Sequence, residues 1–167
     1  MYDFTLCFIV YKDKILMLNR EKDPWMGRWN GIGGKIEPDE SPLYSVKREI
    51  LEETGINPYS MRIECKGTLT WNVKDNQRKG LILFVAYPKG SIQLRVPSKT
   101  TEGILDLKSL DWILDEDNMG LADNIPYFLP IILSKEECYH FKCTFENNKL
   151  IKMSHVQIKD ITKILGT

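Results

Sequence analysis

A glycine-rich loop that leads directly into an amphipathic helix restricts the fold of this chain more than any other feature. The loop covers residues 20–34, and the helix is predicted over residues 41–54. Ser41 is a favourable N-cap, Pro42 a favourable first helical residue and Gly55 a favourable stop. Apolar side chains recur at helical spacing and form one stripe that must pack on a core: Leu43, Val46 and Ile50.

The other side of this helix carries a cluster of acids. Glu49, Glu52 and Glu53 stand at positions i, i+3 and i+4, so their side chains can converge on one patch. Like charges at this spacing cost about 0.2–0.5 kcal/mol per exposed pair, which Arg48 offsets by pairing with Glu52. Three carboxylates on one patch are a ready cage for a hard divalent cation, Mg²⁺ or Mn²⁺. A solvated charged face is the other interpretation of this triplet taken alone.

The remaining hydrophobic pattern indicates strands interrupted by helices. Strands are expected over residues 4–10, 15–18, 65–73 and 81–87, within 104–113, and over 139–145 and 149–156. A polar turn around Asp75-Asn76 joins the third strand to the fourth, and a helix is expected to follow Asp123 and run through Ile132. This mixture predicts an α/β (α+β) fold in which a mixed β-sheet lies between helices.

Length and composition exclude several classes of protein. The 167 residues correspond to a single domain, and 23 Lys+Arg balance 23 Asp+Glu. Zero net charge provides no bulk attraction to a nucleic-acid polymer or an anionic membrane, and no apolar run approaches the ~20 residues of a membrane helix. The four cysteines lack a C-x-x-C pair and the two histidines stand alone, so oxygen atoms must bind any metal. We expect a cytoplasmic protein, monomeric or homodimeric, that acts on a small molecule.

The spacing of charged residues around the helix identifies the chain more closely. Residues 34–56 read Gly34-x5-Glu40-x7-Arg48-Glu49-Ile50-x-Glu52-Glu53-x-Gly55-Ile56. This run resembles the Nudix box, G-x5-E-x7-R-E-U-x-E-E-x-G-U with U aliphatic, and meets every defined position. The resemblance implies a Nudix fold and Mg²⁺-dependent hydrolysis of a nucleoside diphosphate linked to a further group. Such hydrolysis requires charge neutralisation on the phosphate oxygens and a positioned water, both of which metal ions supply.

The resemblance also implies roles for individual residues. The metal ligands would be Glu49, Glu52 and Glu53, joined by the backbone carbonyl of Gly34. Arg48 would orient a glutamate, and Glu40 would support the loop and reach the metal through water. Glu102, in the loop before the strand within 104–113, would bind a further metal or activate water; its alternative is an exposed loop acid.

A finer likeness concerns the substrate. Residues 29–35 look like the approach to the box in MutT-like enzymes, which hydrolyse oxidised purine nucleoside triphosphates such as 8-oxo-dGTP to monophosphate and pyrophosphate. The likeness covers nearly the whole chain but is less specific outside the box. It implies five substrate-binding residues: Thr5, Asn30, Trp71, Asp123 and Asn124. The chain departs from the animal enzyme at Leu121, near a base-stacking Trp, and at Asn124, in place of a second acid.

Each of these residues also has a structural interpretation. Trp71 would pack in the core, Asn30 would cap a loop, and Asp123 would be the N-cap of the following helix. The box itself does not distinguish among general nucleoside triphosphates, dinucleoside polyphosphates and nucleotide sugars as alternative substrates. A nucleotide-binding module without hydrolysis is disfavoured, because all the box carboxylates are present.

Overall fold

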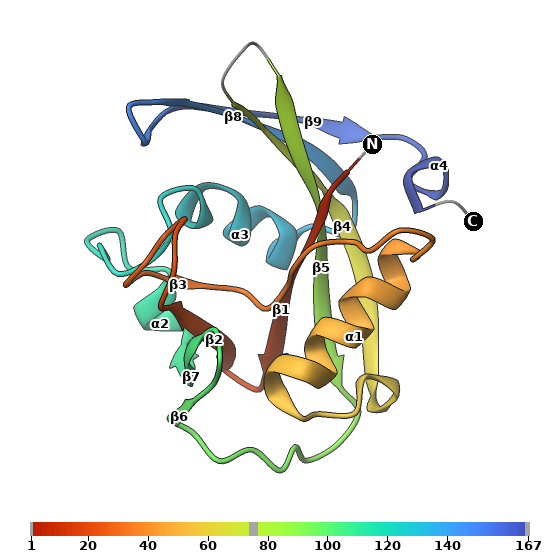
Figure 1. The fold of residues 1–167 in the computed structure, drawn as a ribbon, viewed down its shortest axis with the longest axis vertical. Coiled ribbons are helices and arrows are strands. Elements are labelled where there is room, and N and C mark those ends of the chain that lie inside the picture. Colours follow the sequence, from red (N-terminus) through yellow and green to blue (C-terminus); the bar gives the residue numbers. More distant parts are fainter. Residues whose placement is uncertain (1, 74–76, 166–167) are drawn as a thin grey trace.

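A computed structural model describes residues 2–73 and 77–165 (Figure 1). In chain order the elements are β1 (Phe4–Tyr11), β2 (Lys14–Arg20), β3 (Trp29–Asn30), α1 (Pro42–Thr54), the 3₁₀ turn η1 (Pro58–Ser60), β4 (Met61–Asn72), β5 (Arg78–Pro88), β6 (Ser98–Lys99), β7 (Gly103–Ser109), α2 (Leu110–Ile113), α3 (Ile125–Ser134), β8 (Cys138–Glu146), β9 (Lys149–Ile158) and α4 (Thr162–Leu165). The turn predicted around Asp75-Asn76 lies outside the described residues.

The strands form one mixed sheet in the order β6-β7-β2-β1-β5-β4-β8-β9, with β3 added beside β2. The pairs β1–β5 and β4–β8 are parallel, and the other neighbours in this order are antiparallel. The consecutive strands β1–β2 and β8–β9 form antiparallel hairpins. The prediction of a mixed sheet is confirmed.

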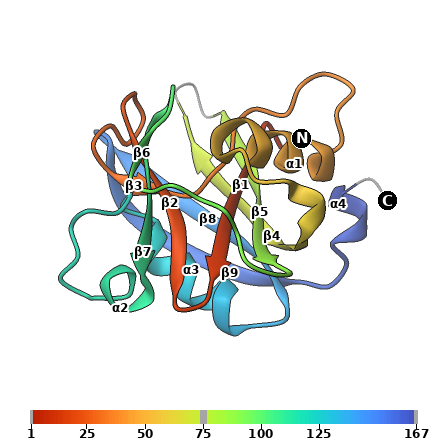
Figure 2. The same ribbon diagram turned by 90° about the horizontal axis from the view of Figure 1, so that it is seen from below.

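Helices cover both faces of the central strands (Figures 1 and 2). On one face, Val46 and Ile50 of α1 pack in a core with side chains of β1 such as Cys7. On the other face, Phe128 of α3 packs in a second core with Phe8 of the same strand. Alternate residues of β1 thus serve opposite cores, as strand geometry requires. The predicted α/β (α+β) arrangement, a sheet between helices, is confirmed.

The end signals of α1 act as the sequence predicts. The Ser41 hydroxyl accepts a hydrogen bond from the Tyr44 amide, and Gly55 ends the helix in the left-handed conformation at φ +72°. The apolar stripe differs from the prediction at one position. Leu43 is 41% exposed, whereas Ser45 is fully buried beside Val46. The buried face is therefore turned slightly away from the one that the apolar residues alone indicate.

Two further segments differ in detail from expectation. The stretch 104–113 divides into strand β7 and the short helix α2. Asp123 was one candidate for the N-cap of helix α3. This helix begins at Ile125, so Asn124 occupies the N-cap position instead. The Asn124 side chain makes no capping hydrogen bond within the described residues. No helix in residues 2–73 and 77–165 is long and apolar enough to cross a membrane.

Candidate active site

The glycine-rich loop lies between β1 and the acidic side of α1. The Thr5 amide donates to the Gly34 carbonyl at 2.9 Å, which fastens the loop to β1. A Cβ atom on Gly33 would stand 2.1 Å from the Thr5 carbonyl oxygen, and one on Gly34 would stand 2.4 Å from Oε1 of Glu49. Gly33 therefore requires glycine, because a side chain would meet the backbone of β1, whereas a side chain on Gly34 would push against the movable carboxylate of Glu49.

Arg48 binds several acids of the predicted site at once. Its Nε and Nη2 donate to the two carboxylate oxygens of Glu40, at 2.8 and 3.0 Å. Its Nη1 donates to Glu49 at 2.6 Å and to Glu52 at 3.1 Å. The guanidinium also reaches the Lys35 carbonyl at 3.1 Å. Arg48 therefore connects the loop to the helix and fixes the direction of two carboxylates, as a rigid fork of donors can.

Glu40 is tied into the loop. Its Oε2 also accepts a hydrogen bond from the Glu37 amide at 3.0 Å, and its side chain is only 6% exposed. The hydrogen bonds from Arg48 lower the pKa of Glu40 to about 2, against the opposing effect of burial. Both oxygens are thus engaged within the protein, which matches the loop-supporting role that the family resemblance implies.

Glu53 lies in a different environment. Its Oε2 is buried and has no hydrogen-bond partner among the described residues. Burial, followed by the nearby charges of Glu49 and Glu102, raises the pKa of Glu53 to about 8. Burial also raises the pKa of Glu49, against the lowering effect of Arg48. The fold therefore brings Glu102, from the loop before β7, into electrostatic range of Glu53.

These residues fit a divalent cation. A buried carboxylate oxygen without a partner is costly, and a cation would satisfy it. The donors are carboxylates, the hard oxygen ligands that Mg²⁺ prefers. Glu52 would bind such a cation from the solvent side, since its side chain is 58% exposed. Within residues 2–73 and 77–165 no three His, Cys, Asp or Glu side chains already stand as a formed metal cluster. A bound ion must compete with Arg48 for Glu49 and Glu52.

The residues predicted to bind substrate lie on separate elements. Thr5 is on β1, only 2% exposed, and its hydroxyl has no partner within the described chain. Trp71, at the end of β4, lies 6.1 Å from the ring of Phe4 and borders the core under α3. Asn30, on β3, accepts a hydrogen bond from the Gly31 amide at 2.8 Å, the contact expected of a loop cap. The loop-cap interpretation of Asn30 and its predicted substrate-binding role are compatible.

Asp123 and Asn124 precede α3. Asp123 is half-exposed and lies 3.9 Å from a guanidinium nitrogen of Arg28. Asn124 lies beside the thiol of Cys143 on β8, where burial raises the pKa of that thiol to about 11. The two residues therefore stand at the same end of the sheet as β3. Nothing in the residue pattern singled out Arg28, because an arginine in a loop has no distinctive spacing.

An aromatic contact packs the loop between β2 and β3 against β8. Trp25, in the loop between β2 and β3, lies 5.8 Å from the ring of Phe145 on β8. Phe145 is fixed by Asn72, whose amide nitrogen donates to its carbonyl at 2.9 Å and whose amide oxygen accepts from its N–H at 2.7 Å. The loop that contains Trp25 therefore packs against the surface of β8.

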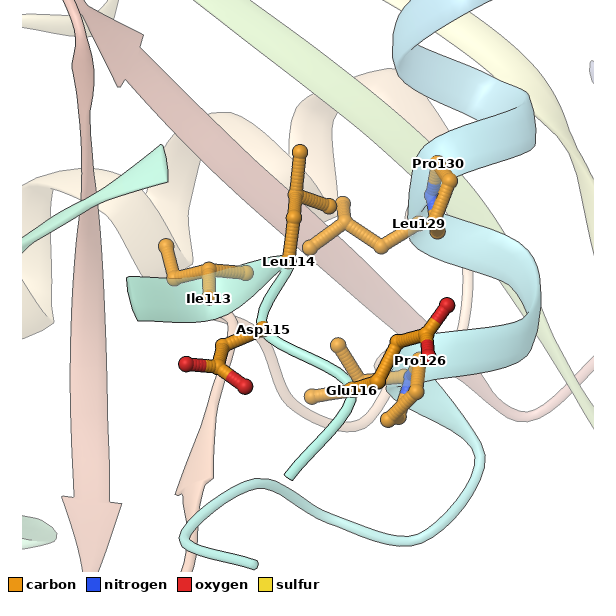
Figure 3. Close-up of a pocket in the computed structure, with 8 residues that line it drawn as sticks. Ile113, Leu114, Asp115, Glu116, Pro126, Leu129 and Pro130 are labelled. Atoms are coloured by element: carbon orange, nitrogen blue, oxygen red, sulfur yellow. The ribbon is translucent and has the colours of Figure 1, made fainter. Parts of the chain in front are cut away.

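Open pockets occur away from the acidic helix. One of about 320 Å³ is lined by Glu64, Cys65, Lys66 and Glu136. Another, of about 90 Å³, lies between α2 and α3 (Figure 3) and is lined by Ile113, Leu114, Asp115, Glu116, Ile125, Pro126, Leu129 and Pro130. Neither includes a residue of α1, so the carboxylates and the substrate-binding candidates do not border these cavities.

Comparison with known proteins agrees with this geometry. Residues 1–127, more than half of the chain, match the family model of the NUDIX domain. The chain belongs to the Nudix family. It is 41% identical over 142 residues to a Nudix hydrolase of Bacillus subtilis, YvcI, described as uncharacterised, covering 84% of this chain and 85% of that protein. It is therefore a Nudix hydrolase, an enzyme that acts on phosphoric anhydrides in nucleotide-like substrates.

Other relatives of this Nudix hydrolase have more specific names. The oxidized purine nucleoside triphosphate hydrolase of Mus musculus is 35% identical over 54 residues, covering 32% of this chain and 35% of that protein. The crystal structure of a MutT protein from Bacillus halodurans superposes with a TM-score of 0.73 at 25% identity, covering 93% of this chain and 97% of that one. The Nudix domain of Shewanella oneidensis NrtR, complexed with ADP ribose, shares the fold at 24% identity and a TM-score of 0.55, covering 79% and 82% of the two chains.

Proposed function

We propose that this Nudix hydrolase cleaves oxidised purine nucleoside triphosphates, such as 8-oxo-dGTP, to the monophosphate and pyrophosphate in the presence of Mg²⁺. It would work as one domain over residues 1–167, monomeric or homodimeric, on the cytoplasmic nucleotide pool. The observation that carries the hydrolytic part is the buried, unpartnered oxygen of Glu53 beside Glu49 and Glu102. The substrate part is supported by the local likeness to the mouse hydrolase.

The residues of α1 have distinct tasks in this proposal. Glu49, Glu52 and Glu53 would hold Mg²⁺, and the carbonyl of Gly34 has a second lone pair for it beside the one that accepts from Thr5. When bound, the ion neutralises charge on the phosphate oxygens and activates water. Arg48 keeps Glu49 and Glu52 oriented, and Glu40 keeps Arg48 in place.

Glu102 stands apart from the helix but within electrostatic reach of Glu53. Its side chain is 38% exposed and lies 3.8 Å from Nζ of Lys22. This placement suits a residue that adds an oxygen ligand or accepts a proton from the attacking water.

Base recognition is assigned to polar atoms of β3 and of the segment that precedes α3. An amide such as that of Asn30 has a donor and an acceptor side by side, and the Asp123 carboxylate accepts N–H groups. The 8-oxo form of guanine adds an N7–H donor and an O8 acceptor to the guanine pattern. A site whose polar atoms pair with these groups rejects bases that leave them unpaired.

The test is a screen of kcat/KM with Mg²⁺ over 8-oxo-dGTP, the unmodified nucleoside triphosphates, ADP-ribose and dinucleoside polyphosphates, with the products identified. We expect 8-oxo-dGTP to have the highest kcat/KM and to yield pyrophosphate. A higher value for another nucleotide would redirect the substrate assignment while retaining the hydrolase. Binding without turnover of any member would refute the catalytic proposal.

A further inference from the structure

Arg28 joins two segments that are distant in the sequence. Its Nη1 donates to the carbonyl of Met119, 91 residues further along the chain, and at 3.2 Å to the carbonyl of Leu121. The same nitrogen lies 3.9 Å from Oδ1 of Asp123. One guanidinium thus contacts three alternate residues of a single segment, 119–123.

Main-chain hydrogen bonds join the same two segments. The Trp29 amide donates to the Gly120 carbonyl at 2.8 Å, and the Ala122 amide donates to the Trp29 carbonyl at 3.0 Å. Trp29 and Leu121 form a parallel bridge outside the named strands. The segment 119–123 therefore runs alongside β3, with Asn30 at the end of one and Asp123 at the end of the other.

This attachment matters because of where it occurs. Helix α2 ends at Ile113 and α3 begins at Ile125, so Asp123 lies in the long connection between two helices. A loop acid recognises a base only if its backbone is fixed, since a displacement of about 1 Å at a positioning contact costs up to ~10²-fold in rate. The contacts of Arg28 supply this fixation from the residue that immediately precedes the strand of Asn30.

We propose that Arg28 is a positioning residue that sets base selectivity by holding Asp123 and Asn124 in register with Asn30. The inference rests on the proposed nucleotide hydrolysis but not on which base is preferred. Among the described residues, the side-chain contacts of Arg28 are all with residues 119–123, and none is with an acid of α1. Its loss should therefore affect recognition of the base and leave the chemical step largely intact.

The test compares the wild type with Arg28→Ala and Arg28→Lys, using Arg62→Ala as the control. Arg62 is an exposed arginine of β4 that pairs with Glu64, outside both segments. For each protein, kcat and KM are measured on 8-oxo-dGTP and on the unmodified nucleoside triphosphates. The readout is the selectivity ratio, which is the highest kcat/KM in the panel divided by the lowest.

We expect Arg28→Ala to lower the selectivity ratio about tenfold or more, mainly by raising KM for the preferred nucleotide, with kcat changed less than about threefold. Arg28→Lys should be intermediate, because an ammonium donates hydrogen bonds but lacks the fork of the guanidinium. Arg62→Ala should match the wild type. Hydrogen exchange at the Trp29 and Ala122 amides should accelerate in Arg28→Ala and not in Arg62→Ala.

Several results would overturn the inference. An unchanged ratio in Arg28→Ala and Arg28→Lys would do so, as would an equal loss of kcat/KM on every nucleotide, which would mean that Arg28 binds the triphosphate. A wild type without selectivity would show that no base is recognised here. A wild type that prefers an unmodified nucleotide, with the preference lost in Arg28→Ala, would refute the oxidised-purine assignment and support the role of Arg28. If Arg28→Ala does not fold, Arg28→Lys decides the question.

Discussion

Both carboxylate oxygens of Glu40 accept hydrogen bonds from the guanidinium of Arg48, at 2.8 and 3.0 Å, across the junction between loop and helix. This fork-to-fork contact is the strongest geometry available to an arginine and a carboxylate. It leaves Nη1 of Arg48 directed at Glu49 and Glu52. The position of the loop and the orientation of the acids therefore depend on the same side chain.

Removing the Glu40 charge should weaken the fold. Glu40→Gln leaves Arg48 partly unpaired, and breaking a buried pair costs about 3 kcal/mol of unfolding free energy. The pKa of Glu40 is about 2 in the folded protein, below its unfolded value. Its contribution is thus present above the unfolded pKa, about 4.5, and disappears as pH falls toward 2. Urea unfolding between pH 2 and 7 should show a smaller acid-induced loss in Glu40→Gln than in the wild type. Glu116→Gln, at an exposed loop acid, should leave the wild-type profile unchanged.

The contribution of Glu53 to the stability of the fold should depend on pH in the opposite direction. Its pKa is raised to about 8 in the protein without metal, so the folded state holds a proton that the unfolded state releases near 4.5. The stability of the protein in EDTA should therefore fall as pH rises from about 5 to about 8. Glu53→Gln should flatten this decline. A decline of the same slope in both proteins would contradict the assignment.

Mg²⁺ should reverse the dependence of stability on pH that Glu53 causes. Because a carboxylate must be ionised to bind a cation, the increase in Tm caused by Mg²⁺ should be larger at pH 8 than at pH 6. A hundredfold excess over Kd stabilises the native state by about 2.7 kcal/mol. Thermal unfolding with and without Mg²⁺ measures this increase, which should shrink in Glu52→Gln and Glu53→Gln. Equal increases in both variants and the wild type would place the metal elsewhere.

Substitution of the site acids should lower kcat. Glu53→Gln and Glu49→Gln keep the side-chain shape and remove a ligand charge, so we expect kcat to fall at least ~10²-fold, about 2.7 kcal/mol of barrier. Glu102→Gln should reduce kcat if that residue binds metal or activates water. Steady-state rates on the best nucleotide of the screen measure these effects. Rates near wild type in both Glu49→Gln and Glu53→Gln would move the chemistry to another part of the molecule.

The glycine positions allow a steric test. In Gly34→Ala the new Cβ would stand 2.4 Å from Oε1 of Glu49, so it should displace that carboxylate and lower kcat. Gly33→Ala places Cβ 2.1 Å from a backbone oxygen of β1 and should destabilise the protein, since backbone yields less easily than a side chain. Gly90→Ala is the matched control, because nothing lies within 4 Å of its Cβ. Measurement of kcat and Tm for the three variants separates the two effects; an active, stable Gly34→Ala would disprove the close contact.

The residues assigned to the base can be tested separately. Asn30→Ala and Asp123→Ala should reduce the preference for 8-oxo-dGTP over dGTP, because each removes polar atoms that pair with the oxidised base. Trp71→Ala should raise KM for both nucleotides, since stacking discriminates little among bases. The ratio of the two kcat/KM values is the quantity to compare. A ratio unchanged by both polar substitutions would mean that other residues recognise the base.

The sequence predicted the parts of this molecule that depend on local rules. The caps of α1 follow from residue type and spacing, as does the pairing of Arg48 with Glu52. Contacts between distant segments were not predictable in this way. Glu102 meets Glu53 only because β7 pairs with β2, and Arg28 meets residues 119–123 only through the packing of two loops. The burial of Ser45 and the exposure of Leu43 also depend on how α1 packs on the sheet, which the apolar stripe alone does not specify.

The reciprocal hydrogen bonds between Asn72 and the backbone of Phe145 have a consequence for the boundaries of the catalytic unit. The side-chain amide of Asn72 imitates a peptide group and adds one more rung to the parallel ladder at the point where β4 ends. That rung presents Phe145 to Trp25, although Phe145 lies beyond residue 127, where the family match stops. The aromatic surface that Trp25 meets thus comes from the last hairpin, outside the portion that matches the family model. A chain that ended at residue 127 would therefore keep every acid of α1 and lose the aromatic surface against which Trp25 packs.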